Sequence, residues 1–250
     1  MKSKTNQGQQ LWDKAARKNA MHYVCWDSDN WSKEDFFKTG ENDVLIFTSD
    51  FFKKYDFIPS DKRVLDIGCG VGRLTRAFSG IFKEAYGVDI SGEMVEQAKQ
   101  LNTDINNLYF SKNNGSDLTL FQDNFFDFCF SYIVFQHISD DRIIENYIRE
   151  ISRVLKPGGL FKFQVLGSKP LLKNRVPIPR SIFNFILRTG LIKYYVAVFG
   201  SNFGDEIQRH AWGVCLSDKI VEKWARKANL KVSGITGEDT PYLWCFGVKN

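Results

Sequence analysis

The chain has 250 residues and a net charge of +5, so one α/β domain with additions is the simplest organisation, and charge alone does not imply a nucleic-acid partner. Its five cysteines form no C-x-x-C pair and no zinc-like spacing, which favours reduced thiols in a cytoplasmic protein. No apolar run reaches the roughly 18–20 residues of a membrane span, and Met1–Gln10 has no apolar signal core.

The apolar pattern predicts two helices ahead of the first strand. Residues 1–10 are expected to be disordered, one helix is expected over 11–24, and a further helix over 44–55. Aromatic side chains gather around the first helix. These residues are Trp12, Tyr23, Trp26 and Trp31. Either they pack the helix onto the domain, or they form a lid whose ring faces attract positive charge.

From residue 63 the pattern alternates between strands and helices, which is typical of a parallel sheet with helices on both faces. Strands are expected at 63–67, 85–89, 108–110, 126–131 and 160–165, and helices at 72–82, 92–101 and 141–155. The alternation stops after residue 165. A helix over 217–228 and two strands over 231–235 and 242–248 then finish the chain as an antiparallel hairpin.

The stretch 64–75 is read as a strand, a glycine turn and a helix. Gly68, Gly70 and Gly72 lack Cβ atoms where the strand ends, so a ligand can approach the main chain and the helix N–H groups. This G-x-G-x-G pattern differs from the dinucleotide fingerprint, because Arg73 stands where the third glycine of that fingerprint would fall. Two acidic residues accompany the turn, Asp66 before it and Asp89 at the end of the next strand.

Together with four later markers, this turn resembles the class I S-adenosylmethionine (SAM)-dependent methyltransferases of the small-molecule type. The later markers are Val88–Ser91, Phe126–Ser131, Gln136–Ile138 and Leu155–Gly159. The resemblance covers about residues 60–165 and 217–250. It implies a Rossmann-like, seven-stranded, mostly parallel sheet with helices on both faces and the last strand antiparallel, an N-terminal helical lid, and an inserted cap after the fifth strand.

The resemblance also implies one methyltransferase domain over residues 1–250. Within it, 1–58 is expected to be an N-terminal helical extension and 59–165 the SAM-binding core. Residues 166–216 are expected to be an inserted substrate cap, and 217–250 the C-terminal helix and hairpin.

SAM is the cofactor that the resemblance implies, with S-adenosylhomocysteine (SAH) as the product and no metal. The methionine end of SAM is expected beside residues of the glycine turn, namely Asp66, Gly68, Cys69, Gly70 and Arg73. Asp89 is expected to accept hydrogen bonds from both ribose hydroxyls, since charge-assisted bonds of this kind are strong. Purely structural roles are the alternatives: Asp66 orders the turn, Asp89 complements the next helix dipole, and Cys69 is only a small residue.

The adenine end is expected to lie between two later segments. Ile90 and Met94 are expected to sandwich the ring, and Asn114 with the Gly115 backbone is expected at its amino group. Ser131 and Tyr132 complete the predicted site, because ligands in open α/β sheets bind at the carboxyl ends of the strands.

The implied reaction is the in-line transfer of a methyl group from SAM to an oxygen or nitrogen atom of a small-molecule acceptor. His137 is the candidate general base, because it follows the fourth strand near the predicted mouth of the site. Its alternative role is to shape the pocket through hydrogen bonds. His22 and His210 are further candidates for the base.

The segment 156–204 contains eight Lys or Arg residues and no Asp or Glu. As a cap over the active site it is expected to favour an anionic acceptor carrying a carboxylate or phosphate. A homodimer contact, or a surface for a membrane or an acidic carrier, is the alternative. DNA or RNA is disfavoured as the substrate, since no nucleic-acid module accompanies the basic residues.

Other classes of function stay open at this point. They are a non-catalytic SAM-binding or adaptor protein, a methyltransferase acting on a macromolecular or membrane-associated acceptor, and a nucleotide-dependent oxidoreductase with a related sheet. The G-x-G-x-G spacing speaks against the oxidoreductase. Identity of the acceptor does not follow from the fold.

Overall fold

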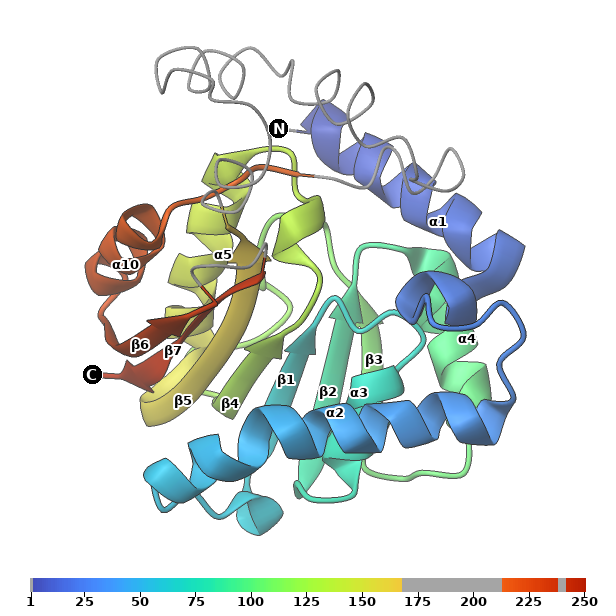
Figure 1. Cartoon of the computed structure of the whole chain (residues 1–250), viewed down its shortest axis with the longest axis horizontal. Helices are drawn as coiled ribbons and strands as arrows, with labels where there is room; N and C mark the ends of the chain where they lie inside the picture. Colours follow the sequence, from blue (N-terminus) through green and yellow to red (C-terminus); the bar gives the residue numbers. More distant parts are fainter. Residues whose placement is uncertain (1, 168–212, 238–241) are drawn as a thin grey trace.

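The computed structural model describes residues 2–167, 213–237 and 242–250, and a seven-stranded sheet of order β3-β2-β1-β4-β5-β7-β6 forms its centre (Figure 1). The strands are β1 Arg63–Ile67, β2 Glu84–Asp89, β3 Leu108–Lys112, β4 Phe126–Ser131, β5 Leu155–Leu166, β6 Leu230–Thr236 and β7 Tyr242–Lys249. Only β7 runs antiparallel to its neighbours β5 and β6. This arrangement confirms the predicted fold class.

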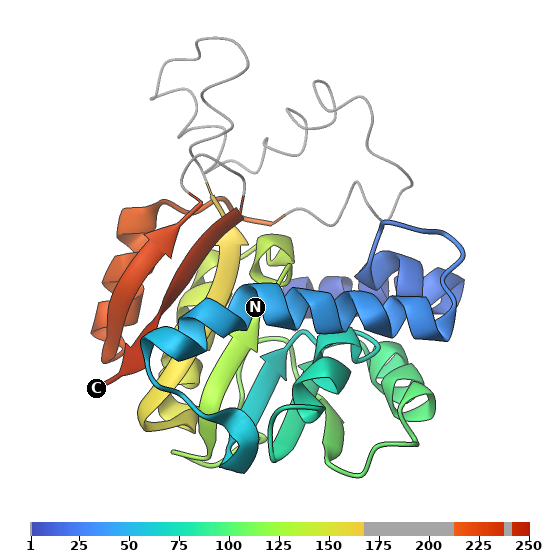
Figure 2. The same ribbon diagram turned by 60° about the horizontal axis from the view of Figure 1, so that its bottom comes forward.

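Helices cover both faces of this sheet. The described helices are α1 Lys2–Val24, α2 Lys33–Lys54, α3 Arg73–Ser79, α4 Gly92–Leu101, α5 Asp141–Val154 and α10 Asp218–Lys227, with 3₁₀ turns η1 Pro59–Asp61 and η2 Phe135–His137. Helices α2 and α3 pack on one face, and α5 and α10 pack on the other (Figures 1 and 2). In Figure 1, α1 lies beyond the tips of the central strands.

Strand alternation divides the core into two apolar layers. Val64 and Phe128 face α2 and α3, whereas Leu65, Ile67 and Cys129 face α5. The first layer is aromatic: the Phe128 ring lies 5.1 Å from Phe52 and 6.0 Å from Phe51, centroid to centroid. These contacts account for part of the high phenylalanine content.

Three expected boundaries were wrong. The expected disorder over residues 1–10 is replaced by helix α1, which begins at Lys2. Helix α2 begins at Lys33 rather than near residue 44, because the Ser32 side chain caps it by accepting from the Asp35 N–H. Strand β5 begins at Leu155, since Leu155 already pairs with Phe126 of β4.

The predicted cap over 166–216 lies largely outside the described residues. At its ends, Gly167 and Leu216 form a parallel bridge, and the Leu216 N–H donates to the Leu166 carbonyl at 2.8 Å. Among the described helices, none is long and apolar enough to cross a membrane.

Candidate active site

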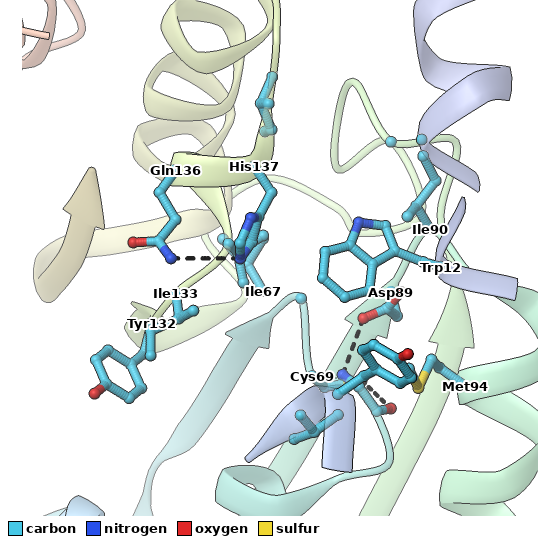
Figure 3. Close-up of a pocket in the computed structure, with 18 of the residues that line it drawn as sticks. Trp12, Ile67, Cys69, Asp89, Ile90, Met94, Tyr132, Ile133, Gln136 and His137 are labelled. Atoms are coloured by element: carbon cyan, nitrogen blue, oxygen red, sulfur yellow. Dashed lines mark hydrogen bonds between the residues drawn. The ribbon is translucent and has the colours of Figure 1, made fainter. Parts of the chain in front are cut away.

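A cavity of about 840 Å³ opens at the carboxyl ends of β1, β2 and β4. Helix α1 contributes Gly8, Leu11 and Trp12 to its wall. Figure 3 shows the cavity with Asp89, Ile90 and Met94 on one side and with Tyr132, Gln136 and His137 on the other. The cavity therefore brings residues from both halves of the sheet into one space.

The glycine turn forms the floor between these two sides. Gly68 and Gly70 have φ values of +77° and +53°, a left-handed conformation that L side chains rarely adopt. A Cβ atom at Gly68 would lie 2.2 Å from a Val134 methyl carbon, and one at Gly70 would lie 2.5 Å from a Val24 methyl carbon. Both glycines are thus required by backbone conformation and by close packing.

Asp89 ends β2 and points its carboxylate at the turn. Its Oδ2 accepts from the Gly70 N–H at 2.9 Å, and its Oδ1 accepts from the Ser91 N–H at 2.8 Å. Burial raises the pKa of Asp89, although these backbone hydrogen bonds oppose the shift. Because each carboxylate oxygen has two lone pairs, the fixed carboxylate can still accept two hydroxyl donors.

Asp66 lies under the turn and is only 2% exposed. Its Oδ2 accepts from the Thr75 hydroxyl at 2.7 Å. Burial raises the pKa of Asp66 to about 7, and the negative charge of Asp89 acts in the same direction. A cation placed nearby would favour the ionised form of this carboxyl group.

Arg73 begins α3 and is almost completely buried. Its Nη1 donates to Asp43 Oδ2 at 2.7 Å and to the Thr39 hydroxyl at 3.1 Å, which ties the guanidinium to α2. Its Nε has no hydrogen-bond partner among the described residues, although Arg73 lines the cavity. An unpartnered buried donor is costly, so this atom is suited to an anionic group of a ligand.

Ile90, Met94 and Gly115 line the end of the cavity expected for adenine. Asn113 also lines it, whereas Asn114 is exposed and its Oδ1 accepts from the N–H groups of Ser116 and Asp117. The Asn114 side chain therefore shapes its own loop. Asn113 is the loop residue that reaches the cavity, and its amide donates to the Tyr147 hydroxyl at 2.9 Å.

Two predicted residues at the centre differ in their access to the cavity. Cys69 lines it, but burial raises the pKa of this thiol well above its ordinary value, which makes it a poor nucleophile. Ser131 is fully buried beneath the wall, and its hydroxyl donates to the Ile67 carbonyl at 3.0 Å. Ser131 thus joins the ends of β4 and β1.

The wall opposite Asp89 is a tight turn after β4. Ile133 has φ +57°, which is a strained conformation for a β-branched residue. Its N–H donates to the buried Gln164 side-chain oxygen at 2.9 Å. Next to it, the Tyr132 ring lines the cavity and stacks on Trp244 at a centroid distance of 5.4 Å. Strain of this kind often accompanies functional turns.

His137 lies on this wall, within η2. Its ring contacts Trp12 of α1 edge-on at a centroid distance of 5.1 Å, and the Gln136 amide nitrogen lies 3.4 Å from its Nε2 (Figure 3). Gln136 is 5% exposed, and its side-chain oxygen has no partner among the described residues. The pair therefore presents polar atoms to the cavity beside an aromatic ring.

Other sequence candidates lie away from the cavity. His22 contacts the Ser28 carbonyl and Asp29 and does not line the cavity, and His210 lies outside the described residues. Of the basic segment, Lys156 pairs with Asp127, and Lys162 lies among the rings of Phe47, Phe51, Trp244 and Phe246. Of the aromatic residues near α1, Trp12, Tyr23 and Trp26 line the cavity, whereas Trp31 packs on Phe36.

Sequence reasoning missed Asn113, Gln136 and Ile133 as cavity residues. Gln136 belongs to the family marker Gln136–Ile138, and Asn113 is adjacent to the predicted Asn114, so the sequence near both residues pointed to the site. The left-handed conformation of Ile133 had none, because isoleucine rarely adopts it.

Comparison with known proteins now identifies the domain. Residues 65–163 match the family model described as a methyltransferase domain. Strands β2 and β4 and the last three residues of β1, whose carboxyl ends border the cavity, lie inside this match. Residues 65–163 therefore form a methyltransferase domain. SAM is the cofactor of this family.

Similar proteins include other methyltransferases. An uncharacterized methyltransferase, YcgJ, of Bacillus subtilis is 36% identical over 104 residues, or 41% of this chain and 40% of that protein. A demethylmenaquinone methyltransferase of Staphylococcus haemolyticus is 27% identical over 153 residues, or 60% of this chain and 58% of that protein. The chain thus spans about half the length of the curated relatives that it matches.

The methyltransferase fold extends beyond the matched segment. The structure of magnesium protoporphyrin IX methyltransferase from Synechocystis, solved with bound SAH, has a TM-score of 0.58 at 16% identity, and the match covers 93% of this chain and 96% of that one. At this identity the likeness concerns the fold alone. Among the described residues, no group of three or more His, Cys, Asp or Glu side chains could hold a metal ion.

Proposed function

We propose that this protein transfers a methyl group from SAM to an oxygen or nitrogen atom of a small-molecule acceptor. One observation carries this proposal: a single cavity joins the Asp89 carboxylate and the glycine turn to the wall formed by Tyr132 and His137. Its volume of about 840 Å³ is near the upper end of the range of about 300–1,000 Å³ for small-molecule sites. That volume suits a cofactor together with a modest acceptor.

The polar groups on the Asp89 side of the cavity fit SAM. Asp89 binds the ribose hydroxyls with a carboxylate that two backbone N–H groups already orient. The unpartnered Nε of Arg73 donates to the methionine carboxylate, and the ionised form of Asp66 faces its ammonium group or the sulfonium. Ile90, Met94, Asn113 and Gly115 surround adenine.

The acceptor binds against the turn after β4. SAM supplies an activated methyl group, so the protein must orient the acceptor and exclude water. His137 accepts the proton that an O–H or N–H acceptor loses. Gln136 orients the acceptor through its side-chain oxygen, which has no partner among the described residues, and Trp12 borders the same space beside His137.

Among the described residues, the cavity wall carries more carboxyl groups than cationic side chains. Four carboxyl groups line the cavity, against the two cationic side chains of Lys14 and Arg73. Asp43 is neutralised by its ion pair with Arg73. Neither Lys156 nor Lys162 is among the lining residues.

Calorimetric titration with SAM, SAH and NAD tests the cofactor assignment. We expect SAM and SAH to bind with micromolar affinity, NAD not to bind, and Asp89→Ala to weaken binding of both by at least about 100-fold, since a charge-assisted pair of hydrogen bonds is lost. Asp61→Ala, an exposed carboxylate on η1, is the matched control and should bind as the wild type does. Retained affinity in a folded Asp89→Ala variant would contradict the proposal.

Turnover tests the methyl transfer itself. A library of amines, phenols and alcohols is screened for release of SAH, and His137→Gln should lower kcat by about 10²–10⁴-fold while leaving SAH affinity intact. If the protein binds SAH but no member of the library leads to formation of SAH from SAM, the non-catalytic alternative is favoured.

A further inference from the structure

Helix α1 is fastened to the cofactor side of the cavity by one carboxylate. Asp13 Oδ1 accepts from the Ser91 hydroxyl at 2.6 Å and from the Glu93 N–H at 3.3 Å, so α1 caps the N-terminus of α4 from outside that helix. Burial alone would raise the pKa of Asp13, but these hydrogen bonds outweigh it and the pKa is lowered. The ionised carboxylate is therefore favoured at a helix N-terminus.

Ser91 connects this contact to the ribose site. Its N–H donates to Asp89 Oδ1 at 2.8 Å, and its hydroxyl oxygen also accepts from the Met94 N–H at 3.1 Å. Ser91 is fully buried, so its hydroxyl has little freedom to exchange partners with water. Asp13, Ser91 and Asp89 thus form a continuous hydrogen-bonded series from α1 to the carboxylate assigned to ribose.

Other α1 contacts reinforce the docking. The Gln97 amide donates to the Ala16 carbonyl at 3.2 Å, and Ala15, Ala16 and Ala20 are buried against Val71 and Met94. On the opposite side of the cavity, Trp12 contacts His137. The same helix therefore spans both halves of the site.

The helix is interrupted where it leaves the cavity. Asn19 has φ −169° and ψ 87°, which is not helical, and its Oδ1 accepts from the His22 N–H at 3.2 Å, as an N-cap does. Residues 2–18 therefore form a helical segment of their own, which continues into residues 20–24 through Asn19.

We propose that Asp13 is a positioning residue that fastens α1 over the bound cofactor and holds Asp89 in place through Ser91. The inference rests on the proposed function, because the ligand it governs is SAM or SAH. Release of the ligand then requires the Asp13–Ser91 contact to break. By linkage, ligand binding to Asp89 also strengthens the docking of α1.

Dissociation kinetics of SAH test the proposal. We expect Asp13→Ala to increase the SAH dissociation rate by about tenfold with an association rate within about threefold of wild type, since loss of a hydrogen bond to a charged group acts after binding. Asp13→Asn, which keeps an acceptor oxygen, should show a smaller increase. Amide hydrogen exchange should show SAH protecting residues 5–18 in the wild type and protecting them less in Asp13→Ala.

The matched control is Asp35→Ala. The Ser32 hydroxyl donates to Asp35 Oδ2 at 2.7 Å at the start of α2, which is the same kind of contact away from the cavity. This variant should release SAH within twofold of the wild-type rate.

The outcomes separate the two proposals. If the wild type binds SAH but both Asp13 variants release it at the wild-type rate, with unchanged exchange over residues 5–18, this inference is wrong and the proposed function stands. If the wild type does not bind SAH, both are wrong. If Asp13→Ala does not fold, Asp13→Asn decides by the same rate and exchange measurements.

Discussion

At the scale of single residues, Asp66 is a carboxyl group whose buried environment differs strongly from water. It lies buried between Thr75 and the glycine turn, with Arg73 and Asp89 as its nearest charged neighbours. Burial raises its pKa to about 7, so the folded protein holds this proton where the unfolded chain has already lost it. The folded state is therefore penalised as the pH rises.

The sign of this effect gives a prediction. Between the unfolded pKa of about 4 and the folded pKa of about 7, the unfolding free energy of the wild type should fall relative to Asp66→Asn by about 1.4 kcal/mol per pH unit. Above about pH 7 the difference should be constant. Urea unfolding of both proteins at pH 5, 6, 7 and 8 measures it, and parallel profiles for the two proteins would show that Asp66 titrates normally.

Most of the residues predicted from the sequence for this site line the cavity, but one was chosen a position too late in its loop. Asp66, Arg73 and Asp89 lie at the cavity, as do Ile90, Met94, Gly115, Tyr132 and His137. Their roles as SAM ligands or base stay predictions. The prediction named Asn114, whose side chain instead forms hydrogen bonds within its own loop. The sequence did not distinguish these roles, because several adjacent short polar residues all suit an Asx turn.

At the scale of elements, the turn between β4 and η2 is the strained part of the site. Ile133 adopts φ +57°, which is strained for a β-branched residue, and its side chain is partly buried with 36% of its surface exposed. Gln164 of β5 holds the turn by accepting the Ile133 N–H. The strain directs Tyr132 and His137 toward one cavity.

Glycine at this position should relieve the strain. We expect Ile133→Gly to change the unfolding free energy by less than about 1 kcal/mol, because strain relief of about 1–3 kcal/mol offsets lost burial and added chain entropy. Ile81 is 39% exposed and its φ is not positive, so Ile81→Gly is the control and should destabilise by more than about 1 kcal/mol. Equal losses for both variants, measured by urea unfolding, would count against strain at Ile133.

Elements with a strong apolar period were predictable, whereas the helix start capped by Ser32 and the boundaries set by tertiary contacts were not. Strands β1 and β4 were placed correctly because their apolar runs are buried on both faces. The start of β5 depends on the pairing of Leu155 with Phe126, which no local pattern encodes. The first turns of α1 were predicted to be disordered because they are polar.

At the scale of the whole molecule, the sheet order determines which strand ends meet at the cavity. Strands β1 and β4 are neighbours in space although β2 and β3 come between them in the sequence. Their carboxyl ends therefore meet, which brings Gly68 beside Val134 and places Asp89 across the cavity from His137. Alternation of strands and helices predicted a parallel sheet with helices on both faces but not the order of its strands. The placement of α1 across the opening depends on contacts such as that of Asp13 with Ser91.

The central claim is that SAM binds with its ribose on Asp89 and its methyl group facing the turn after β4. A crystal structure of the protein with SAH tests this most directly. We predict both ribose hydroxyls within about 2.5–3.0 Å of the Asp89 carboxylate oxygens and the sulfur facing Tyr132 and His137. SAH bound without contact to Asp89, or with its sulfur directed toward Ile90 and Gly115, would contradict the account.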